Sequence, residues 1–379
     1  ESDELNIISS IIAKKIGAKF TIARVRNPEY SSNMQFVREN LGISLMLNPE
    51  FESAKNIANK LMFPVALSVE NFFGQKANFI SIRVEKHSFL NGTQLKYLEF
   101  DSQDKIIICT VKRGDEIFIP SGDFKILEGD IIYIAGSIDA VRKFYDKIEQ
   151  SNLKIKSTIV IGGGTISHYL IRKLLENKNK VKVIENDKER AEKLSEAYSK
   201  AIVIRGDEAD QEFLIQEGIK NYDAVVIITD SDEENAVISM FANSITDAKL
   251  ITKMNRTLLL PILESSTGTS TVVPKKVISD MIISVVRSRT DMRSSTMSLL
   301  YRLENKVELI TFEINENSAA IDIPLKDLKI KKGTLVASIL RNGKMIFPGG
   351  NDMIKSNDSV MIVSTIPSIE DFGDILERV

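Results

Sequence analysis

The stretch STIVIGGGTISHYL, from Ser157 to Leu170, decides the fold of this chain. Thr158 to Ile161 has the length and β-branching of a buried parallel strand, and Ser167 to Glu176 has apolar residues at helical spacing. With three glycines between them, they predict a strand, a glycine turn and a helix. Such a unit is typical of dinucleotide-binding folds, in which a pyrophosphate lies at the positively polarised helix N-terminus.

The glycine turn departs from the usual pattern at its third glycine. Gly162 permits the tight turn, and Gly164 lets backbone amides approach a pyrophosphate. The third position packs the helix against the strand and is Ser167 here. Since serine is small, we expect phosphate binding to survive. The alternative interpretation is an ordinary strand-to-helix turn that binds nothing.

A second strand, KVKVIEND, ends in Glu185. This is about 20 residues after the turn, where a dinucleotide fold places the acid that holds the ribose hydroxyls. A carboxylate there repels a 2′-phosphate, which favours NAD over NADP. A solvated helix cap is the alternative role for Glu185. A helix is expected to follow, from Asp187 as N-cap to about Ser199.

Two further strand-and-helix units follow, AIVIRGDEADQEFLIQEGI and YDAVVIITDSDEENAVISMFANSI. Strands that alternate with helices in this way predict a doubly wound parallel sheet.

An internal repeat explains why the glycine turn lies near the middle of the chain. The N-terminal ESDELNIISSIIAKKIGAKFTIARVRNPEY resembles DSDEENAVISMFANSITDAKLITKMNRTLL, with Ser2 and Ser231 229 residues apart. Pro120 and Pro348, in similar hairpin segments, are 228 residues apart. The fold class predicted is α/β, with tandem Rossmann-like doubly wound sheets, each followed by a small α/β C-terminal domain.

The repeat predicts four segments, which are residues 1–70, 71–152, 153–292 and 293–379. Residues 1–70 would be the remainder of a first Rossmann-like domain. The glycine turn of that copy would precede Glu1, so we expect an N-terminally truncated chain that lacks roughly 70 to 80 residues. Each small domain is expected to close with an amphipathic helix, such as SIDAVRKFYDKIEQ in the first.

Composition limits the classes of function. The 379 residues carry a net charge of −2, so no basic field predicts binding to nucleic acid or to an anionic membrane. The single cysteine, Cys109, lies in an apolar run and is expected to be a buried thiol in a reducing compartment. No apolar run approaches the length of a membrane span. A cytoplasmic protein is therefore expected.

These motifs together resemble the TrkA family, the peripheral cytoplasmic subunits of bacterial Trk potassium uptake systems. The segments that carry the resemblance are IARVRNPEY, GGGTIS, VIEND, RGDEAD, TDSDEEN and FPGG. It implies two tandem regulator-of-conductance (RCK) modules and a homotetramer. It also implies NAD(H) as ligand, with ATP or ADP as further candidates, and a Trk-type potassium-translocating membrane subunit as partner, which would hold the protein at the inner face of the membrane.

The resemblance also implies the ligand residues. In the second copy these are Gly162, Gly163, Gly164, Thr165, Ile166, Glu185, Asp207, Thr229 and Asp230, with Asp207 facing the adenine. In the first copy Arg24 and Arg26 remain, and a guanidinium suits phosphate because it offers a bidentate fork. A surface salt bridge is the alternative role for these arginines.

The residue inventory argues against catalysis. The chain has two histidines, and neither His87 nor His168 forms part of a recognisable catalytic or metal-binding pattern. We therefore expect no enzyme, no catalytic residue and no metal site. An NAD-dependent oxidoreductase and an assembly scaffold without nucleotide dependence stay open as alternatives.

Overall fold

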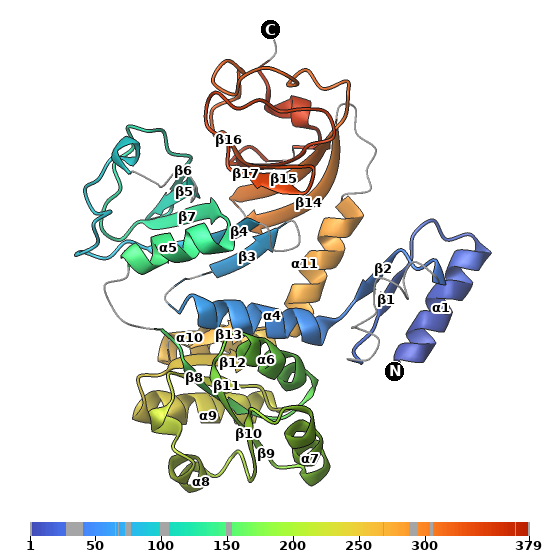
Figure 1. The fold of residues 1–379 in the computed structure, drawn as a ribbon, viewed down its shortest axis with the longest axis vertical. Helices are drawn as coiled ribbons and strands as arrows, with labels where there is room; N and C mark the ends of the chain where they lie inside the picture. The colour runs from blue at the N-terminus through green and yellow to red at the C-terminus, as the bar shows by residue number, and fades with distance from the viewer. Residues whose placement is uncertain are drawn as a thin grey trace. The chain divides into compact units, whose positions relative to one another are not determined.

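The computed structural model describes residues 2–27, 41–64, 66, 68–72, 77–98, 106–148, 154–267, 269–287, 295–303, 306–367 and 369–377 (Figure 1). The chain forms two compact units, Glu1–Pro64 with Leu153–Ser279, and Val65–Asn152 with Asp280–Val379. Strand β3 (Ser68–Phe72) lies across the expected boundary between residues 70 and 71. The boundaries at 152/153 and 292/293 fall outside the described residues, so the four-part division stays a prediction.

The first unit contains a six-stranded parallel sheet with strand order β10-β9-β8-β11-β12-β13. Its strands are β8 (Ser157–Ile161), β9 (Lys180–Glu185), β10 (Ile202–Arg205), β11 (Ala224–Ile227), β12 (Lys249–Lys253) and β13 (Ser270–Val272). The chain runs outward from β8 to β10 and then returns to the other side of β8. The doubly wound sheet is thereby confirmed, with its topological switch point between β8 and β11.

Helices cover both faces of this sheet. An α-helix follows each strand in turn: α6 (Thr165–Glu176), α7 (Lys188–Ala197), α8 (Gln211–Gln216), α9 (Asp232–Ile245), α10 (Leu260–Thr267) and α11 (Pro274–Arg287). Val160 and Val226 pack under α6 and α7, whereas Ile159 and Val225 pack under α8 and α9. This alternation is why the strands are apolar on both faces. Asp187 caps α7 as expected, because its side chain accepts a hydrogen bond from the Arg190 N–H at 2.8 Å.

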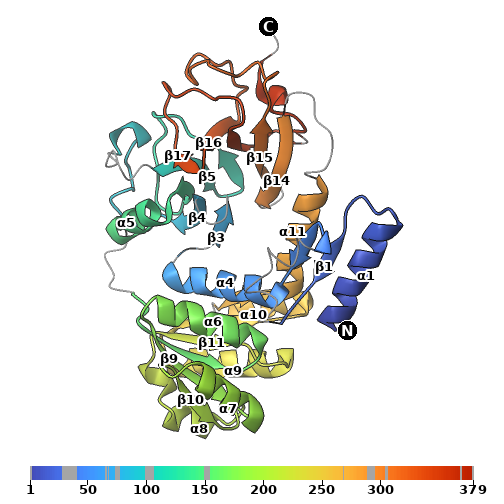
Figure 2. The same ribbon diagram turned by 45° about the vertical axis from the view of Figure 1, so that its right-hand side comes forward.

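The first copy contributes α1 (Asp3–Ile16), β1 (Ile22–Arg24), β2 (Leu45–Leu47) and α4 (Pro49–Met62). Strands β1 and β2 pair in parallel. Helix α4 lies along α6 of the second copy, with Ile57 and Leu61 buried in the same core as Leu170 (Figures 1 and 2). A helix of the first copy therefore completes the cover of the second copy's sheet.

The two copies share their hydrogen bonds as well as their sequence pattern. Two backbone N–H groups donate to a helix N-terminal aspartate in each copy: Arg26 (2.8 Å) and Asn27 (2.7 Å) to Asp3, and Asn255 (2.9 Å) and Arg256 (2.8 Å) to Asp232. The small halves repeat a bidentate ion pair: Arg113 with Asp130, both contacts 2.8 Å, and Arg341 with Asp358 at 2.8 and 2.7 Å. The internal repeat is thus a structural repeat.

The second unit contains two five-stranded antiparallel sheets of equivalent order, β3-β4-β7-β5-β6 and β14-β15-β18-β16-β17. Besides β3, the strands are β4 (Ala77–Arg83), β5 (Ile106–Arg113), β6 (Glu116–Phe118), β7 (Ile131–Gly136), β14 (Ser295–Leu303), β15 (Val307–Ile314), β16 (Thr334–Arg341), β17 (Lys344–Ile346) and β18 (Ser359–Ser364). Phe79 and Cys109 of one sheet share a core with Leu309 and Met361 of the other. Burial raises the pKa of the Cys109 thiol, as suits a packed side chain.

The two small halves end differently. Helix α5 (Ile138–Ile148) forms as expected after β7. The closing helix expected in the second half is wrong, because its place is taken by the 3₁₀ turn η5 (Phe372–Ile375). Pro367 and Gly373 disfavour a continuous α-helix over this segment. Among the described residues of both units, no helix is long and apolar enough to cross a bilayer.

Candidate functional site

The glycine turn lies at the switch point of the parallel sheet. Gly162 has a φ of 100°, and a Cβ placed there would lie 2.9 Å from backbone atoms of Ile228 and Thr229. Its N–H donates to the Ile184 carbonyl at 2.9 Å. Only glycine fits this backbone conformation and this close approach. The turn is therefore fixed between β8, β9 and β11.

The next two glycines have different surroundings. The Gly163 N–H donates to the Glu185 carboxylate at 2.5 Å, and a Cβ on Gly163 would lie 2.6 Å from the same oxygen. Gly164 is the N-cap of α6, and outside its chain neighbours no atom lies within 4 Å of the position its Cβ would take. Since Gly164 lines a cavity, this open space is a cradle at a helix N-terminus that a phosphate can approach.

Ser167 occupies the third glycine position. It is 1% exposed, and its hydroxyl donates a hydrogen bond to the Gly162 carbonyl. The hydroxyl therefore has a partner, and the small side chain allows α6 to pack on the sheet. The turn keeps its shape despite the substitution.

Glu185 is oriented beside the turn before any ligand binds. Its side chain is buried, and its second oxygen accepts a hydrogen bond from the Asp187 N–H at 2.8 Å. The Arg190 guanidinium lies 3.6 Å away. Both carboxylate oxygens of Glu185 thus accept backbone hydrogen bonds, its side chain is 2% exposed, and it is not among the residues that line the cavity described below.

The segment after β10 contains a buried acid that the sequence did not single out. Asp207, which was expected to face the adenine, is exposed and accepts a hydrogen bond from the Ala209 N–H at 2.9 Å. Its neighbour Glu208 is 6% exposed, and its Oε2 has no hydrogen-bond partner. Burial, with Glu185, Glu234 and Asp207 adding repulsion, raises the pKa of Glu208 to about 7. The only sign of Glu208 in the sequence is that it is the second acid of RGDEAD.

Thr229 and Asp230 follow β11 and have different roles. Thr229 is buried, and both its N–H (2.9 Å) and its hydroxyl (2.8 Å) donate to Asn235. Asp230 is 82% exposed at its side chain and lies 3.3 Å from Arg190 and 3.8 Å from Lys253. The structure therefore places Asp230 at the open site and Thr229 beneath it.

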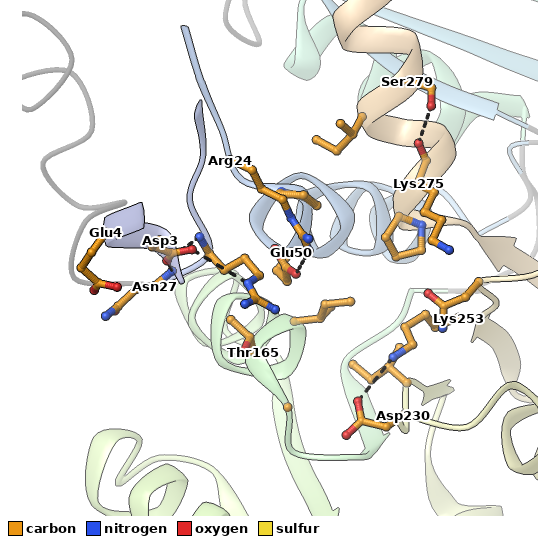
Figure 3. Close-up of a pocket in the computed structure, with 18 residues that line it drawn as sticks. Asp3, Glu4, Arg24, Asn27, Glu50, Thr165, Asp230, Lys253, Lys275 and Ser279 are labelled. Atoms are coloured by element: carbon orange, nitrogen blue, oxygen red, sulfur yellow. Dashed lines mark hydrogen bonds and ion pairs between the residues drawn. The ribbon is translucent and has the colours of Figure 1, made fainter. Parts of the chain in front are cut away.

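A cavity of about 930 Å³ joins the glycine turn to the first copy (Figure 3). Among the predicted ligand residues its walls include Gly164, Thr165, Ile166, Asp230, Arg24 and Arg26. Hydrogen bonds fix the first-copy wall against α6: the Tyr169 hydroxyl donates to the Arg26 carbonyl at 2.9 Å, and the Asn48 amide donates to the Tyr169 hydroxyl at 2.8 Å.

The two arginines also form ion pairs within the first copy. Arg24 pairs with Glu50 at 2.9 Å, and Arg26 lies 3.9 Å from Asp3. Both guanidinium groups are partly exposed on the cavity wall. The salt-bridge alternative thus describes real contacts, and these contacts leave the arginines beside the glycine turn.

The histidines lie outside this cavity. His168 packs against the Tyr198 ring, and burial together with nearby Arg172 lowers its pKa. His87 is exposed on the other unit. Over the described parts of both units, no group of three or more His, Cys, Asp or Glu side chains is placed to hold a metal ion.

Family models match most of the chain. A TrkA-N domain matches residues 158–274, and a TrkA-C domain matches residues 79–149 and again 309–377. The chain belongs to the TrkA family. The TrkA-N match covers the glycine turn and the parallel sheet, and the TrkA-C matches cover most of the two antiparallel sheets but not their first strands, β3 and β14.

Several curated proteins of the TrkA family align over nearly the whole chain. The chain is 29% identical over 371 residues to Trk system potassium uptake protein TrkA homolog 1 of Methanosarcina mazei, covering 96% of this chain and 81% of the relative. It is 28% identical over 374 residues to the TrkA homolog of Archaeoglobus fulgidus, with 99% and 83% covered. With TrkA of Haemophilus influenzae it shares 23% over 377 residues, with 97% and 82% covered.

Solved structures confirm the fold. The GsuK RCK domain aligns at a TM-score of 0.58 with 13% identity, covering 96% of this TrkA-family chain and 76% of that one. The GsuK channel bound to NAD gives the same score and identity, with 96% and 64% covered. At this identity the likeness concerns the fold alone.

Proposed function

We propose that this chain is a nucleotide-sensing regulatory subunit that binds NAD(H) at the glycine turn and gates a Trk-type potassium-translocating membrane subunit. The observation that carries the nucleotide part is the pairing of an open cradle at Gly164 with a buried, oriented Glu185. The curated relatives are named as Trk potassium uptake proteins, which supports the potassium part.

The arrangement favours a dinucleotide with a free ribose 2′-hydroxyl. The pyrophosphate lies at the α6 N-terminus beside Gly164, where unpaired N–H groups and the helix dipole favour negative charge. The ribose of the adenosine part donates to Glu185, whose carboxylate repels a 2′-phosphate. ATP and ADP share this adenosine and are further ligands of the same site.

Arg24 and Arg26 reach the ligand from the first copy. Their position on the cavity wall follows from the hydrogen bonds that hold the Arg26 carbonyl to Tyr169 of α6. The bound nucleotide therefore contacts both copies of the repeat, so that it biases their arrangement through differential affinity. In cells the chain works as a homotetramer on the inner face of the membrane.

Such a site uses the free energy of ligand binding to shift conformations, and it catalyses no reaction. No step of a reaction is assigned to the cavity, and we propose that the chain is not an enzyme. An NAD-dependent oxidoreductase is distinguished by turnover of NADH in an absorbance assay, and a scaffold is distinguished by the absence of nucleotide binding.

The test is calorimetric titration of the full chain with NADH. Glu185→Ala is expected to weaken binding by about 1 to 3 kcal/mol, because it removes charge-assisted hydrogen bonds to the ribose. Glu189→Ala is the matched control, since Glu189 is an exposed acid on α7 that pairs with Lys193. Equal affinities of wild type and Glu185→Ala for both NADH and ATP would remove Glu185 from the site.

A further inference from the structure

Three glutamates lie near one another at the carboxyl edge of the parallel sheet. Glu185 ends β9, Glu208 lies in the turn after β10, and Glu234 is in the first turn of α9. The charges of Glu185 and Glu234 both act on the carboxyl group of Glu208. Glu185 belongs to the proposed nucleotide site, whereas Glu208 has no role in that proposal.

The turn that carries Glu208 is fixed at both of its ends. Before it, the Gly206 N–H donates to the Glu185 carbonyl at 3.1 Å, and the Phe213 ring packs where a Gly206 side chain would lie. After it, Asp210 caps α8 and accepts a hydrogen bond from the Phe213 N–H at 3.2 Å. These contacts hold Glu208 beside the end of β9.

The surroundings of Glu208 suit a protonated carboxyl group. The residue is 6% exposed, and its Oε2 has no hydrogen-bond partner in the described part of the chain. The charged groups that act on it are Glu185, Glu234 and Asp207, all of them acids. A buried carboxylate in such a place is costly, and one proton removes this cost. Because the pKa of Glu208 is raised to about 7, this proton is exchanged near neutral pH.

The cations at this edge of the sheet have other partners. Arg190 lies 3.6 Å from Glu185 and 3.3 Å from Asp230. Arg205, at the end of β10, is exposed and donates to a backbone carbonyl at 3.5 Å. Neither arginine forms an ion pair with Glu208 in the described structure. A proton is therefore the cation that neutralises Glu208.

We propose that Glu208 is a proton-binding site coupled to the nucleotide site, so that the second copy takes up a proton at Glu208 when a nucleotide binds. This inference rests on the proposed function and names a form of regulation of that site. The ligand brings two phosphate charges to the α6 N-terminus and covers the edge of the sheet. Both changes disfavour the ionised carboxylate.

Glu185 connects the two sites. Its carboxylate accepts a hydrogen bond from the Gly163 N–H of the glycine turn at 2.5 Å, and its charge acts on Glu208. Glu208 thus affects the ligand without contact with it. Since coupling between two binding events is reciprocal, a proton on Glu208 strengthens nucleotide binding by the factor by which the nucleotide strengthens proton binding.

Other titrating groups can be separated from this effect. The phosphates of NADH are diesters, which stay ionised over the pH range of the test. His168 is in the first turn of α6, and burial together with Arg172 lowers its pKa, so it is protonated in more acid solutions. A change in NADH affinity between neutral and alkaline pH therefore points to Glu208.

The experiment is calorimetric titration of the full chain with NADH at pH 6.5, 7.5 and 8.5, in two buffers of different ionisation enthalpy. At pH 7.5 we expect wild type to take up a fraction of a proton for each NADH bound. Its affinity should be about three- to tenfold lower at pH 8.5 than at pH 6.5, since a shift of one pKa unit corresponds to a tenfold change in binding.

Glu208→Gln mimics the protonated side chain and cannot ionise. It should bind NADH without proton uptake, with one affinity at all three pH values that is close to the affinity of wild type at pH 6.5. Glu212→Gln removes an exposed acid of α8 and is the matched control, which should behave as wild type does.

Glu234→Gln provides a second test. It removes a repelling charge and leaves Glu208 in place, so proton uptake should persist with its midpoint at a lower pH. A midpoint unchanged from that of wild type would overturn the acidic cluster on which the proposal stands.

The results distinguish failure of the proton site from failure of the nucleotide site. NADH binding without proton uptake in wild type overturns the proton site and leaves the proposed function intact. Proton uptake that persists in Glu208→Gln also overturns it, because another group would then bind the proton. Loss of NADH binding by Glu208→Gln at all three pH values overturns it as well, because the residue would then serve the structure of the site. Absence of NADH binding by wild type at every pH rejects the proposed function, and the proton site with it.

Discussion

Gly162 and Gly164 belong to one turn and are glycines for opposite reasons. At Gly162 the protein itself excludes a side chain, through a φ of 100° and backbone atoms 2.9 Å from a Cβ. At Gly164 the backbone has an ordinary φ of −71°, and outside the chain neighbours no atom lies within 4 Å of a Cβ. The first glycine serves the fold, and the second leaves room for a ligand.

This contrast gives a matched pair of substitutions. Gly162→Ala is expected to destabilise the protein by about 1 to 3 kcal/mol, because its backbone conformation is strained for an L side chain. Gly164→Ala should leave stability within about 0.5 kcal/mol of wild type, yet weaken NADH binding, because its methyl group occupies the phosphate cradle. Urea unfolding and calorimetry measure the two effects, and unchanged NADH affinity in a folded Gly164→Ala protein would contradict this role.

Glu208 has a charge state near neutral pH that depends on the fold. Its carboxyl group is buried near two other glutamates, and its pKa is raised to about 7 from an ordinary value of 4.5. Between these values the folded protein retains a proton that the unfolded chain has released. The free energy of unfolding must therefore fall as the pH rises through this window.

Glu208→Gln should remove most of that pH dependence. The variant cannot ionise, so at pH 8 we expect it to be more stable than wild type by roughly 1 kcal/mol, the order of the cost of a buried polar group without a partner. At pH 5 the two proteins should be similar, because Glu208 is protonated in the folded state. Urea unfolding at both pH values, with the exposed Glu212→Gln as control, tests this. A constant difference between the proteins at both pH values would contradict it.

At the scale of elements, local sequence patterns predicted the strands, turns and caps that depend on neighbouring residues. The strand at Thr158 to Ile161, the glycine turn and the Asp187 cap follow from residue types within one or two turns, and they formed as β8, α6 and α7. The closing helix of the second small half failed because a proline and a glycine outweighed its apolar spacing. The spacing of apolar residues alone does not show how strongly a proline and a glycine oppose a helix.

Contacts between distant elements were beyond a single sequence. The docking of α4 on α6, and the hydrogen bonds from Tyr169 to Arg26 and from Asn48 to Tyr169, join residues more than 100 positions apart. The spacing of Glu185 from the turn could be read because one βαβ unit fixes it. Glu208, Arg190 and Lys253 could not, since their roles depend on which side chains face them across the sheet.

At the scale of the whole molecule, two helices carry the chain out of the first unit. Helix α4 ends at Met62, two residues before the unit does, and α11 runs from Pro274 through the end of the unit at Ser279. The N-terminal residues of both helices, Pro49 and Pro274 among them, line the cavity. Under the proposed function we therefore expect a ligand that changes the position of either helix N-terminus to act on the segments that lead out of this unit.

The last prediction joins the cavity to potassium uptake. The double change Arg24→Ala and Arg26→Ala should leave the protein folded, because the partly exposed ion pairs that it removes contribute about 0 to 1 kcal/mol. In a strain that lacks its own TrkA gene, wild type should restore growth at low external potassium, and the double variant should not. Lys15→Ala with Lys19→Ala, two exposed cations of the same segment outside the cavity, should restore growth as wild type does. The failure has a physical cause: without the arginines the bound nucleotide loses its contacts with the first copy and no longer distinguishes the conformations that it must shift. Full growth with the double variant would remove the arginines from regulation, and a wild type that restores no growth would reject the gating role itself.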